Sequence, residues 1–287
     1  MWVFKEQRLY RTTSEKGKRE MALAKGSGPF GERHGGAFNF DTSVLKAHTL
    51  YFEDCAKRVR AVFNGETVAD SRRVKILHET GHLPVYYFPE EDLRHDLLEE
   101  SDRVTHCPFK GDAAYRSVRV GDRAAKDAVW GYPEPLEDAP PIADYVAFYH
   151  GAMDKWLEED EETFGHPHDP YHRVDVLESS RHVKVRVGGE VVAETDRPKV
   201  LFETSLPPRY YFPLEDVRTE LLSESETKTV CPYKGISSHW SARVGGERVE
   251  DVAWGYSEPL PEAQKVAGCL CFYDDRVKLE VDGERQG

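Results

Sequence analysis

The sequence is poor in long apolar runs and in cysteine. No segment approaches the ~18 consecutive apolar residues of a membrane-spanning helix, and the N-terminus has no apolar signal-peptide core. The five cysteines are an odd number in a chain of 287 residues, which argues against a disulfide framework. We therefore expect a cytoplasmic protein that has reduced thiols and makes no contact with a membrane.

Basic residues are also scarce. The 39 lysines and arginines are outnumbered by 52 aspartates and glutamates, so the formal net charge is −13 at pH 7. Proteins that bind nucleic acid neutralise its phosphates with clustered Lys and Arg. The one dense basic stretch, residues 5–19, lies in an N-terminal segment without apolar periodicity. The composition predicts no nucleic-acid partner.

Several familiar catalytic and metal-binding motifs are missing. The sequence has no P-loop, no Gly-x-Ser-x-Gly, no Cys-x-x-Cys and no Gly-x-Gly-x-x-Gly after a predicted strand. His166, His168 and His172 lie near Asp169, but two prolines interrupt their spacing, and we interpret them as histidines of a surface loop. The sequence thus predicts neither a metal site nor a cofactor.

The sequence does contain a long internal repeat. Residues 75–80 (KILHET) return as residues 199–204 (KVLFET), with a shift of 124 positions. The same shift applies without a gap from Arg58 to Tyr149. A repeat of this length has the size of a domain rather than of a solenoid unit. The chain therefore contains a duplicated domain.

Apolar and polar residues within each copy mostly follow a period of two. Residues 59–63 show this pattern, and Asn64-Gly65 then supplies a hairpin turn. Residues 89–98 begin with proline and acidic residues and place leucines on one face, which predicts a short amphipathic helix. We predict a mainly β protein made of two tandem copies of a compact antiparallel β domain, each with one short helix.

The repeat and the composition together divide the chain into five segments. Residues 153–160 are acidic and are predicted to form a helix that connects the copies. We expect the two domains to pack against each other as a pseudo-dimer. The predicted segments are a flexible N-terminal tail (1–45), a first repeat domain (46–150), an acidic helix and loop as connector (151–170), a second repeat domain (171–275) and a C-terminal tail (276–287).

The sharpest candidate for chemistry is a repeated Thr-x-Cys-Pro-x-Lys-Gly segment. It holds Cys107 and Lys110 in the first copy, and Cys231 and Lys234 in the second. The proline forces a turn after the cysteine, and the lysine three residues on could lower the pKa of the thiol. The alternative is a buried cysteine beside a turn, with a solvated lysine. Both interpretations stay open at this point.

A second repeated block reads Trp-Gly-Tyr-x-Glu-Pro. Two aromatic rings and one carboxylate at a bent strand end suit the lining of a ligand pocket. In the alternative interpretation, the tryptophan anchors the core and the glutamate lies on an exposed turn. The candidate residues are Trp130, Tyr132 and Glu134, with their copies Trp254, Tyr256 and Glu258.

Glu79 and Glu203 each end an apolar strand segment. A carboxylate in such a position is expected to be partly buried, and burial of a charge requires a partner. Lys110 and Arg119 are the basic residues that we expect to supply it in the first copy. The pair would then serve either as a structural ion pair or as part of a reactive site.

Two further repeated features involve a tyrosine and an aspartate. Tyr86 and Tyr210 begin a Tyr-Tyr-Phe-Pro run, in which alternate rings must face opposite sides of a strand, and one ring could stack on a ligand. Asp92 and Asp216 lie near the start of the predicted helices. We interpret them as caps that satisfy free backbone N–H groups there, or as charges of the first helical turn.

Together these blocks resemble the family called domain of unknown function 427. The resemblance covers nearly all of residues 48–275, in two copies. It implies a compact all-β fold like a β-tent or a small half-open barrel, and the missing cysteine knuckles argue against a zinc-bearing β-tent. The nucleotidyltransferase label attached to the family has no matching motif here, because no Gly-Ser motif is followed by paired aspartates.

These patterns predict a small-ligand-binding module with one pocket in each repeat, framed by the repeated Glu, Tyr, Cys, Lys and Trp-Gly-Tyr residues. The alternatives are an enzyme that uses the cysteine or glutamate with the neighbouring lysine, and a scaffold protein. The two copies differ at the expected rim of the ligand pocket, because Tyr115 of the first copy corresponds to His239 and His78 corresponds to Phe202. The two pockets are therefore not expected to be equivalent.

Overall fold

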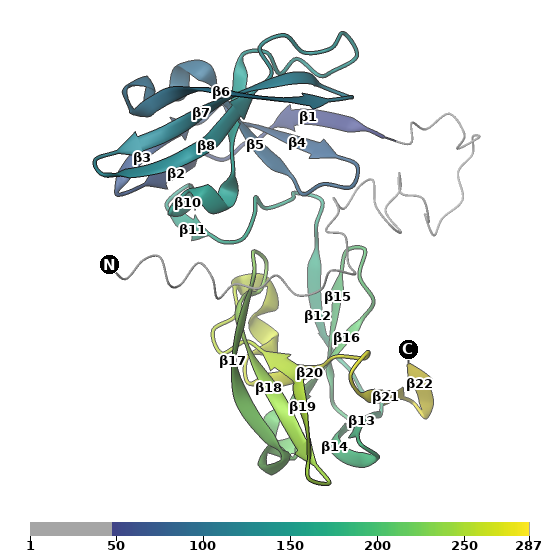
Figure 1. The fold of residues 1–287 in the computed structure, drawn as a ribbon. Helices are drawn as coiled ribbons and strands as arrows, with labels where there is room; N and C mark the ends of the chain where they lie inside the picture. The colour runs from purple at the N-terminus through teal and green to yellow at the C-terminus, as the bar shows by residue number, and fades with distance from the viewer. Residues whose placement is uncertain (1–47, 287) are drawn as a thin grey trace, which may run out of the picture. The chain divides into compact units, whose positions relative to one another are not determined.

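The computed structural model describes residues 48–286, so the predicted N-terminal tail and its basic stretch lie outside the described residues. The described chain forms two compact units and passes from the first to the second between Asp169 and Pro170. The first unit is coloured purple to teal in Figure 1 and the second green to yellow. Each unit contains one copy of the repeat.

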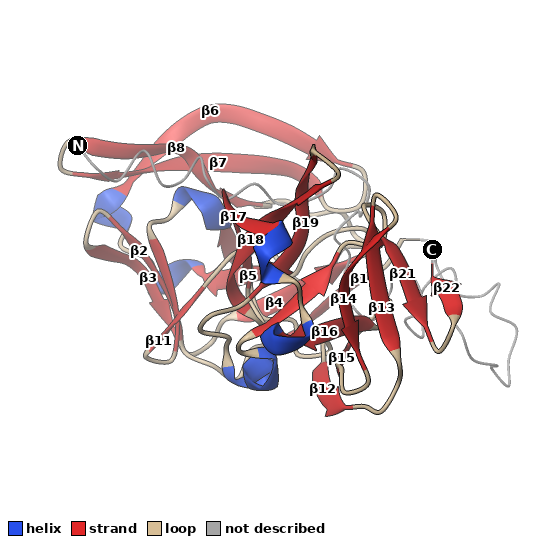
Figure 2. Ribbon diagram, turned by 90° about the horizontal axis from the view of Figure 1, so that it is seen from below, coloured by secondary structure: helices blue, strands red, loops and turns tan. Residues whose placement is uncertain are grey.

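The first unit consists of two antiparallel sheets, and Figure 2 shows its three long neighbouring strands β6, β7 and β8. In spatial order, the larger sheet contains β1 (Leu50–Asp54), β4 (Lys75–Glu79), β5 (Val85–Pro89), β9 (Tyr145–Phe148), β8 (Arg123–Gly131), β7 (Gly111–Val120) and β6 (Leu98–Cys107). The smaller sheet contains β11 (Glu161–Thr163), β10 (Lys155–Glu158), β2 (Val59–Phe63) and β3 (Glu66–Ser71).

The second unit repeats this arrangement, which confirms the prediction of two tandem antiparallel β domains. Its larger sheet contains β12 (Val174–Glu178), β15 (Lys199–Glu203), β16 (Arg209–Pro213), β20 (Cys269–Phe272), β19 (Glu247–Gly255), β18 (Gly235–Val244) and β17 (Leu222–Cys231). Its smaller sheet contains β14 (Glu190–Thr195), β13 (Val183–Val187), β21 (Lys278–Val281) and β22 (Glu284–Gln286). In each sheet of residues 48–286, the first and last strands do not pair with each other, so none of these sheets closes into a barrel.

Each unit ends in a hairpin that the sequence patterns did not predict. The acidic helix predicted at residues 153–160 is wrong, because β10 and β11 occupy this segment and β10 pairs with β2. Trp156 and Glu158 are buried and their neighbours less so, which is the alternation of a strand. In the second unit the equivalent hairpin, formed by β21 and β22, lies in the segment that was predicted to be a C-terminal tail. The two units therefore extend beyond residues 150 and 275.

The amphipathic helix predicted at residues 89–98 forms two separate 3-10 turns. Leu93 leaves the helical conformation, with φ −102° and ψ 153°, because it bridges to Ala69 and enters the core. None of the helical segments in residues 48–286 has the length and apolar character needed to cross a membrane. The turns are η2 (Glu90–Asp92) and η3 (His95–Leu97), with η5 (Leu214–Asp216) and η6 (Thr219–Leu221) in the second unit.

Asp92 and Asp216 lie in the first turn of η2 and η5, as one of our two interpretations expected, but they make no capping hydrogen bond. Asp92 instead accepts hydrogen bonds from the Ser71 hydroxyl and the Arg73 guanidinium, each at 2.6 Å. Asp216 accepts one from the Thr195 hydroxyl at 2.7 Å. In both units this aspartate thus ties its 3-10 turn to the end of a strand.

The middle of the larger sheet is buried on both faces. In β5, Tyr86 and Phe88 pack into the core between the two sheets, whereas Tyr87 packs into a second core on the outer face. β16 repeats the division, with Tyr210 in the inner core and Tyr211 in the outer one. The two tyrosines of each Tyr-Tyr-Phe-Pro run therefore lie on opposite faces, as the strand period requires.

Gly255 marks a close approach between β19 and β20. A Cβ atom on Gly255 would lie 2.7 Å from the Cys269 carbonyl oxygen and 2.9 Å from Leu270 Cδ2. Gly255→Ala is therefore expected to lower the free energy of unfolding of the second unit by about 1–3 kcal/mol, measured by urea unfolding. Gly151→Ala, whose Cβ meets no heavy atom within 4 Å, is the matched control. An equal loss in both variants would contradict the steric explanation.

Candidate functional site

Three charged or titratable side chains meet on the outer face of the first unit. Glu79 ends β4, Lys110 occupies the turn between β6 and β7, and His48 precedes β1. Glu79 Oε1 lies 3.1 Å from His48 Nε2, and Glu79 Oε2 accepts a hydrogen bond from Lys110 Nζ. Burial alone would raise the pKa of Glu79, but Lys110 outweighs burial and the pKa is lowered. We call these residues the first triad.

The second unit contains the same arrangement, the second triad. His172 Nε2 lies 3.0 Å from Glu203 Oε1, and Lys234 Nζ donates to Glu203 Oε2 at 2.5 Å. Burial opposes ionisation of Glu203, yet its hydrogen bond to His172 and the charge of Lys234 lower its pKa to about 2. Burial would also lower the pKa of Lys234, but the charges of Cys231 and Glu203 raise it.

An aromatic ring covers the histidine of each triad. Phe109 stacks on His48 with ring centroids 3.6 Å apart and planes 9° apart, and Tyr233 stacks on His172 with centroids 4.1 Å apart. Phe109 is 42% exposed, whereas Tyr233 is only 7% exposed. The first triad is therefore covered by a ring at the surface, and the second by a buried ring.

The cysteine and the tyrosine of the two repeated blocks lie against the triads. The Tyr132 ring centroid lies 5.7 Å from Lys110 Nζ, and the half-buried Cys107 packs against the cluster that contains Tyr132. In the second unit, the backbone N–H of Lys234 donates to the Cys231 carbonyl oxygen at 3.4 Å. Burial raises the pKa of both Tyr132 and its copy Tyr256, so these phenols are neutral at pH 7. Each triad thus has a thiol and a phenol beside its ion pair.

The tryptophan of each Trp-Gly-Tyr block lies near the triad of its unit and packs with a tyrosine there. Trp254 Nε1 donates to the Tyr211 hydroxyl at 3.2 Å, and Trp130 packs against the cluster that contains Tyr87. Trp254 and Tyr211 share one buried cluster with Tyr256, which joins them to the second triad. Each unit therefore has an indole close enough to report on its site by fluorescence.

Four of the predicted site residues do not reach the triads. Tyr86 and Tyr210 face the inner core, and the Tyr86 hydroxyl donates to Glu158 Oε1 at 2.6 Å. Glu134 and Glu258 are exposed. Glu134 lines a shallow hollow of about 220 Å³ together with His106 and Asp112. The remaining predicted residues, the glutamate, cysteine, lysine, tyrosine and tryptophan of each copy, come together.

The comparison with protein families matches the chain twice, over residues 51–159 and 175–283, to the domain of unknown function DUF427, also labelled NTP_transf_9. The chain belongs to the DUF427 family. No curated protein matches it. Both DUF427 matches run into the closing hairpin of their unit, which agrees with the extended unit boundaries.

The prediction that Glu79 takes a basic partner is confirmed for Lys110, but the sequence patterns missed the histidines of both DUF427 triads. His172 was interpreted as a surface histidine, and this is wrong, because its side chain is only 16% exposed and contacts Glu203. The signal was present, since His48 and His172 are separated by the repeat length. The sequence did not show that this histidine contacts the glutamate. In the first unit that contact depends on the pairing of β1 with β4, which are far apart in sequence.

The first DUF427 unit buries two further carboxylates, Glu158 and Asp169, whereas the described part of the second unit buries no carboxylate besides Glu203. Glu158 accepts hydrogen bonds from Tyr86, Lys57 and the ring of His168, the last at 3.0 Å. Burial would raise its pKa, but these partners, His168 first, lower it to about 2. The structurally equivalent position in β21 is Val281, which is buried without a charge. His168 is therefore also not a free surface histidine.

Each triad offers hydrogen-bond donors and charge. A lysine ammonium has three donors, and among the described residues Glu79 is the only carboxylate that Lys110 contacts. The other two N–H groups could donate to a carboxylate or carbonyl oxygen of a ligand. Residues 48–286 contain no group of three or more His, Cys, Asp and Glu side chains arranged to hold a metal ion.

Proposed function

We propose that each DUF427 unit binds a small polar molecule at its triad, so that the tandem chain has two related sites. The observation that carries this proposal is that both units bury the same histidine, glutamate and lysine, contributed by three separate segments. A buried ion pair adds little net stability, because removing both charges from water costs about as much as their attraction returns. The fold alone therefore gives little reason for the triad.

The chemistry of the site points to a ligand with a carboxylate or carbonyl group. The lysine supplies a charge-assisted donor, and the neutral phenol of Tyr132 supplies a second polar contact. The exposed Phe109 ring stacked on His48 is placed to pack against a planar ligand or to move aside for it. The first unit is the more accessible of the two, because its covering ring is at the surface.

The test is a thermal-shift and tryptophan-fluorescence titration with a panel of small carboxylates and amides. We expect saturable binding by the native chain, and about 10- to 100-fold weaker binding after Glu79→Gln with Glu203→Gln, since the glutamates hold the lysines in place. The matched control is Glu99→Gln with Glu224→Gln, which removes the same charge from exposed ion pairs. The proposal fails if no compound binds, or if the triad variant binds as tightly as the control.

A further inference from the structure

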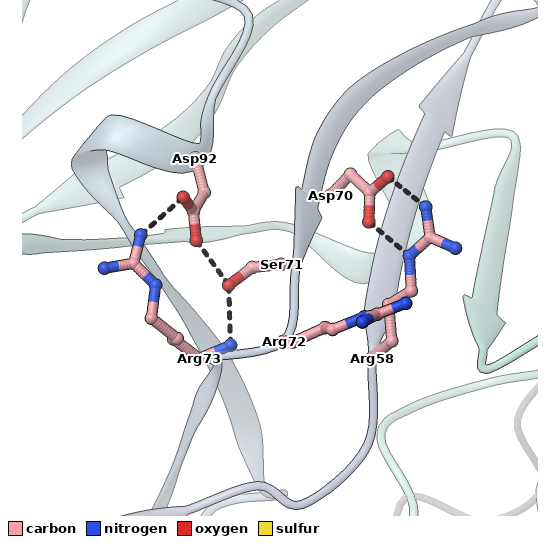
Figure 3. A pocket seen from close by; sticks show the side chains of 6 residues that line it. All are labelled: Arg58, Asp70, Ser71, Arg72, Arg73 and Asp92. Atoms are coloured by element: carbon pink, nitrogen blue, oxygen red, sulfur yellow. Dashed lines mark hydrogen bonds and ion pairs between the residues drawn. The ribbon is translucent and has the colours of Figure 1, made fainter.

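The first unit carries a hollow of about 440 Å³ that is separate from the triad. It lies between the end of β3, the turn that follows it and the 3-10 turn η2. Figure 3 shows the side chains that line it. They are Arg58, Asp70, Ser71, Arg72, Arg73 and Asp92. Three guanidinium groups thus face one hollow in a chain whose net charge is −13.

Two of these arginines are held in place by aspartates. Arg58 Nε and Nη2 donate to the two oxygens of Asp70 at 2.7 and 2.5 Å. Arg73 Nη2 donates to Asp92 at 2.6 Å, and its backbone N–H donates to the Ser71 hydroxyl. Figure 3 shows the two pairs on opposite sides of the hollow. The paired aspartates therefore fix the walls of the hollow and leave Arg58 Nη1 unused by this contact.

Arg72 differs from its two neighbours. Its side chain is exposed, and it makes no hydrogen bond or ion pair within residues 48–286, although its charge contributes to the lowered pKa of Asp70. Figure 3 shows its guanidinium between the two pairs, beside Arg58. A guanidinium presents a planar fork of N–H donors that matches two oxygens of one anion. Within residues 48–286, the N–H donors of the Arg72 guanidinium are thus available to a ligand in the hollow.

The second unit lacks this arrangement. Arg58 and Arg72 are replaced there by His182 and Asp196, while Arg73 is retained as Arg197. The lining positions of the first unit hold three arginines and two aspartates, and the ion pair of Arg73 with Glu91 adds a third carboxylate. The corresponding positions of the second unit hold one arginine, one histidine and three carboxylates: Glu194, Asp196 and Asp216.

We propose that this hollow of the first unit binds the phosphoryl group of a small phosphorylated molecule through Arg72 and Arg58. The Arg72 fork donates to two phosphoryl oxygens, and Arg58 Nη1 supplies the second positive charge. A phosphate monoester carries close to two negative charges at pH 7, so it gains from both guanidinium groups, whereas a simple carboxylate gains from one. The size of the hollow is within the range of small-molecule sites. The triad takes no part in this site.

Calorimetric titration of the full chain at low salt with inorganic phosphate, glycerol phosphate and acetate tests the proposal. We expect saturable binding of both phosphates to one site, weaker binding of acetate, and about 10- to 100-fold weaker phosphate binding by Arg72→Asp. This variant introduces the residue that the second unit has at the same position, and Arg72 has no partner to lose, so the fold should tolerate it. Tighter binding of glycerol phosphate than of phosphate would locate the ester in the hollow.

Arg243→Asp is the matched control, because Arg243 is an exposed arginine of β18 in the second unit and the change in net charge is the same. It should bind phosphate as the native chain does. The proposal is overturned if the native chain binds no phosphate, or if Arg72→Asp binds it as tightly as the native chain. It is also overturned if Arg243→Asp weakens binding equally, since the effect would then be one of net charge.

Discussion

Substitution of Lys234 by methionine is expected to lower the free energy of unfolding of the second DUF427 unit by about 3–5 kcal/mol. Methionine retains the apolar stem of the lysine but removes the ammonium that donates to Glu203. The Glu203 side chain is only 8% exposed, so its carboxylate would be left buried with the His172 contact alone. It must then stay desolvated or bind a proton, and both cost free energy. Urea unfolding followed by circular dichroism measures the loss.

Two further variants separate charge from packing. Lys228→Met removes a half-exposed lysine of β17 that pairs with Glu224 and donates to the Ser238 hydroxyl, and we expect a change of less than about 1 kcal/mol. Lys234→Met combined with Glu203→Leu removes both buried charges and should recover much of the loss. If the double variant is as unstable as Lys234→Met alone, lost packing rather than the unpaired carboxylate explains the effect.

Acid is expected to destabilise both units between about pH 4.5 and pH 2, through Glu158 in the first and Glu203 in the second. Both carboxyl groups have an ordinary pKa of 4.5 and a folded-state pKa of about 2. Because the folded-state value is the lower one, their contribution is fully present above pH 4.5 and is lost as the pH falls towards 2. A difference of this size corresponds to about 3 kcal/mol for each group.

Urea unfolding of the native chain and of Glu158→Gln and Glu203→Gln, from pH 6 to pH 3, tests this expectation. Each variant should be less stable than the native chain at pH 6, and the difference should shrink as the pH falls. Glu137→Gln, at an exposed glutamate without an ion pair in residues 48–286, should show a constant difference. A difference between Glu203→Gln and the native chain that stays constant down to pH 3 would show that this carboxylate does not govern the acid response.

The parts of the fold that follow from local pattern could be predicted. Alternation of apolar residues and the Asn64-Gly65 turn predicted antiparallel strands, because both depend on neighbouring residues alone. The repeat predicted two equal units. It also narrowed the site to paired residues, among which Glu79 and Lys110 do meet. Their pairing was predictable because a buried carboxylate needs a partner and few basic residues recur with it.

The errors arose where distant contacts override local pattern. Residues 153–160 are rich in acidic residues, and β10 has only four residues, so its alternation was too short to oppose the prediction of a helix. Its strand conformation depends on pairing with β2, which precedes it by most of the unit. Residues 89–98 have helical spacing, but Leu93 is drawn out of the helix by its bridge to Ala69.

The sequence by itself determined that this protein has two copies of one antiparallel β unit, and which few residue types recur in both. Those features reside in local periodicity and in identity at a constant spacing. Only the tertiary structure decided that His48 contacts Glu79, that Tyr86 faces away from Glu79, and that Arg72 lines a hollow without an ion-pair partner in residues 48–286. The face on which a side chain lies, and the charge it meets there, depend on strand register between segments far apart in the chain.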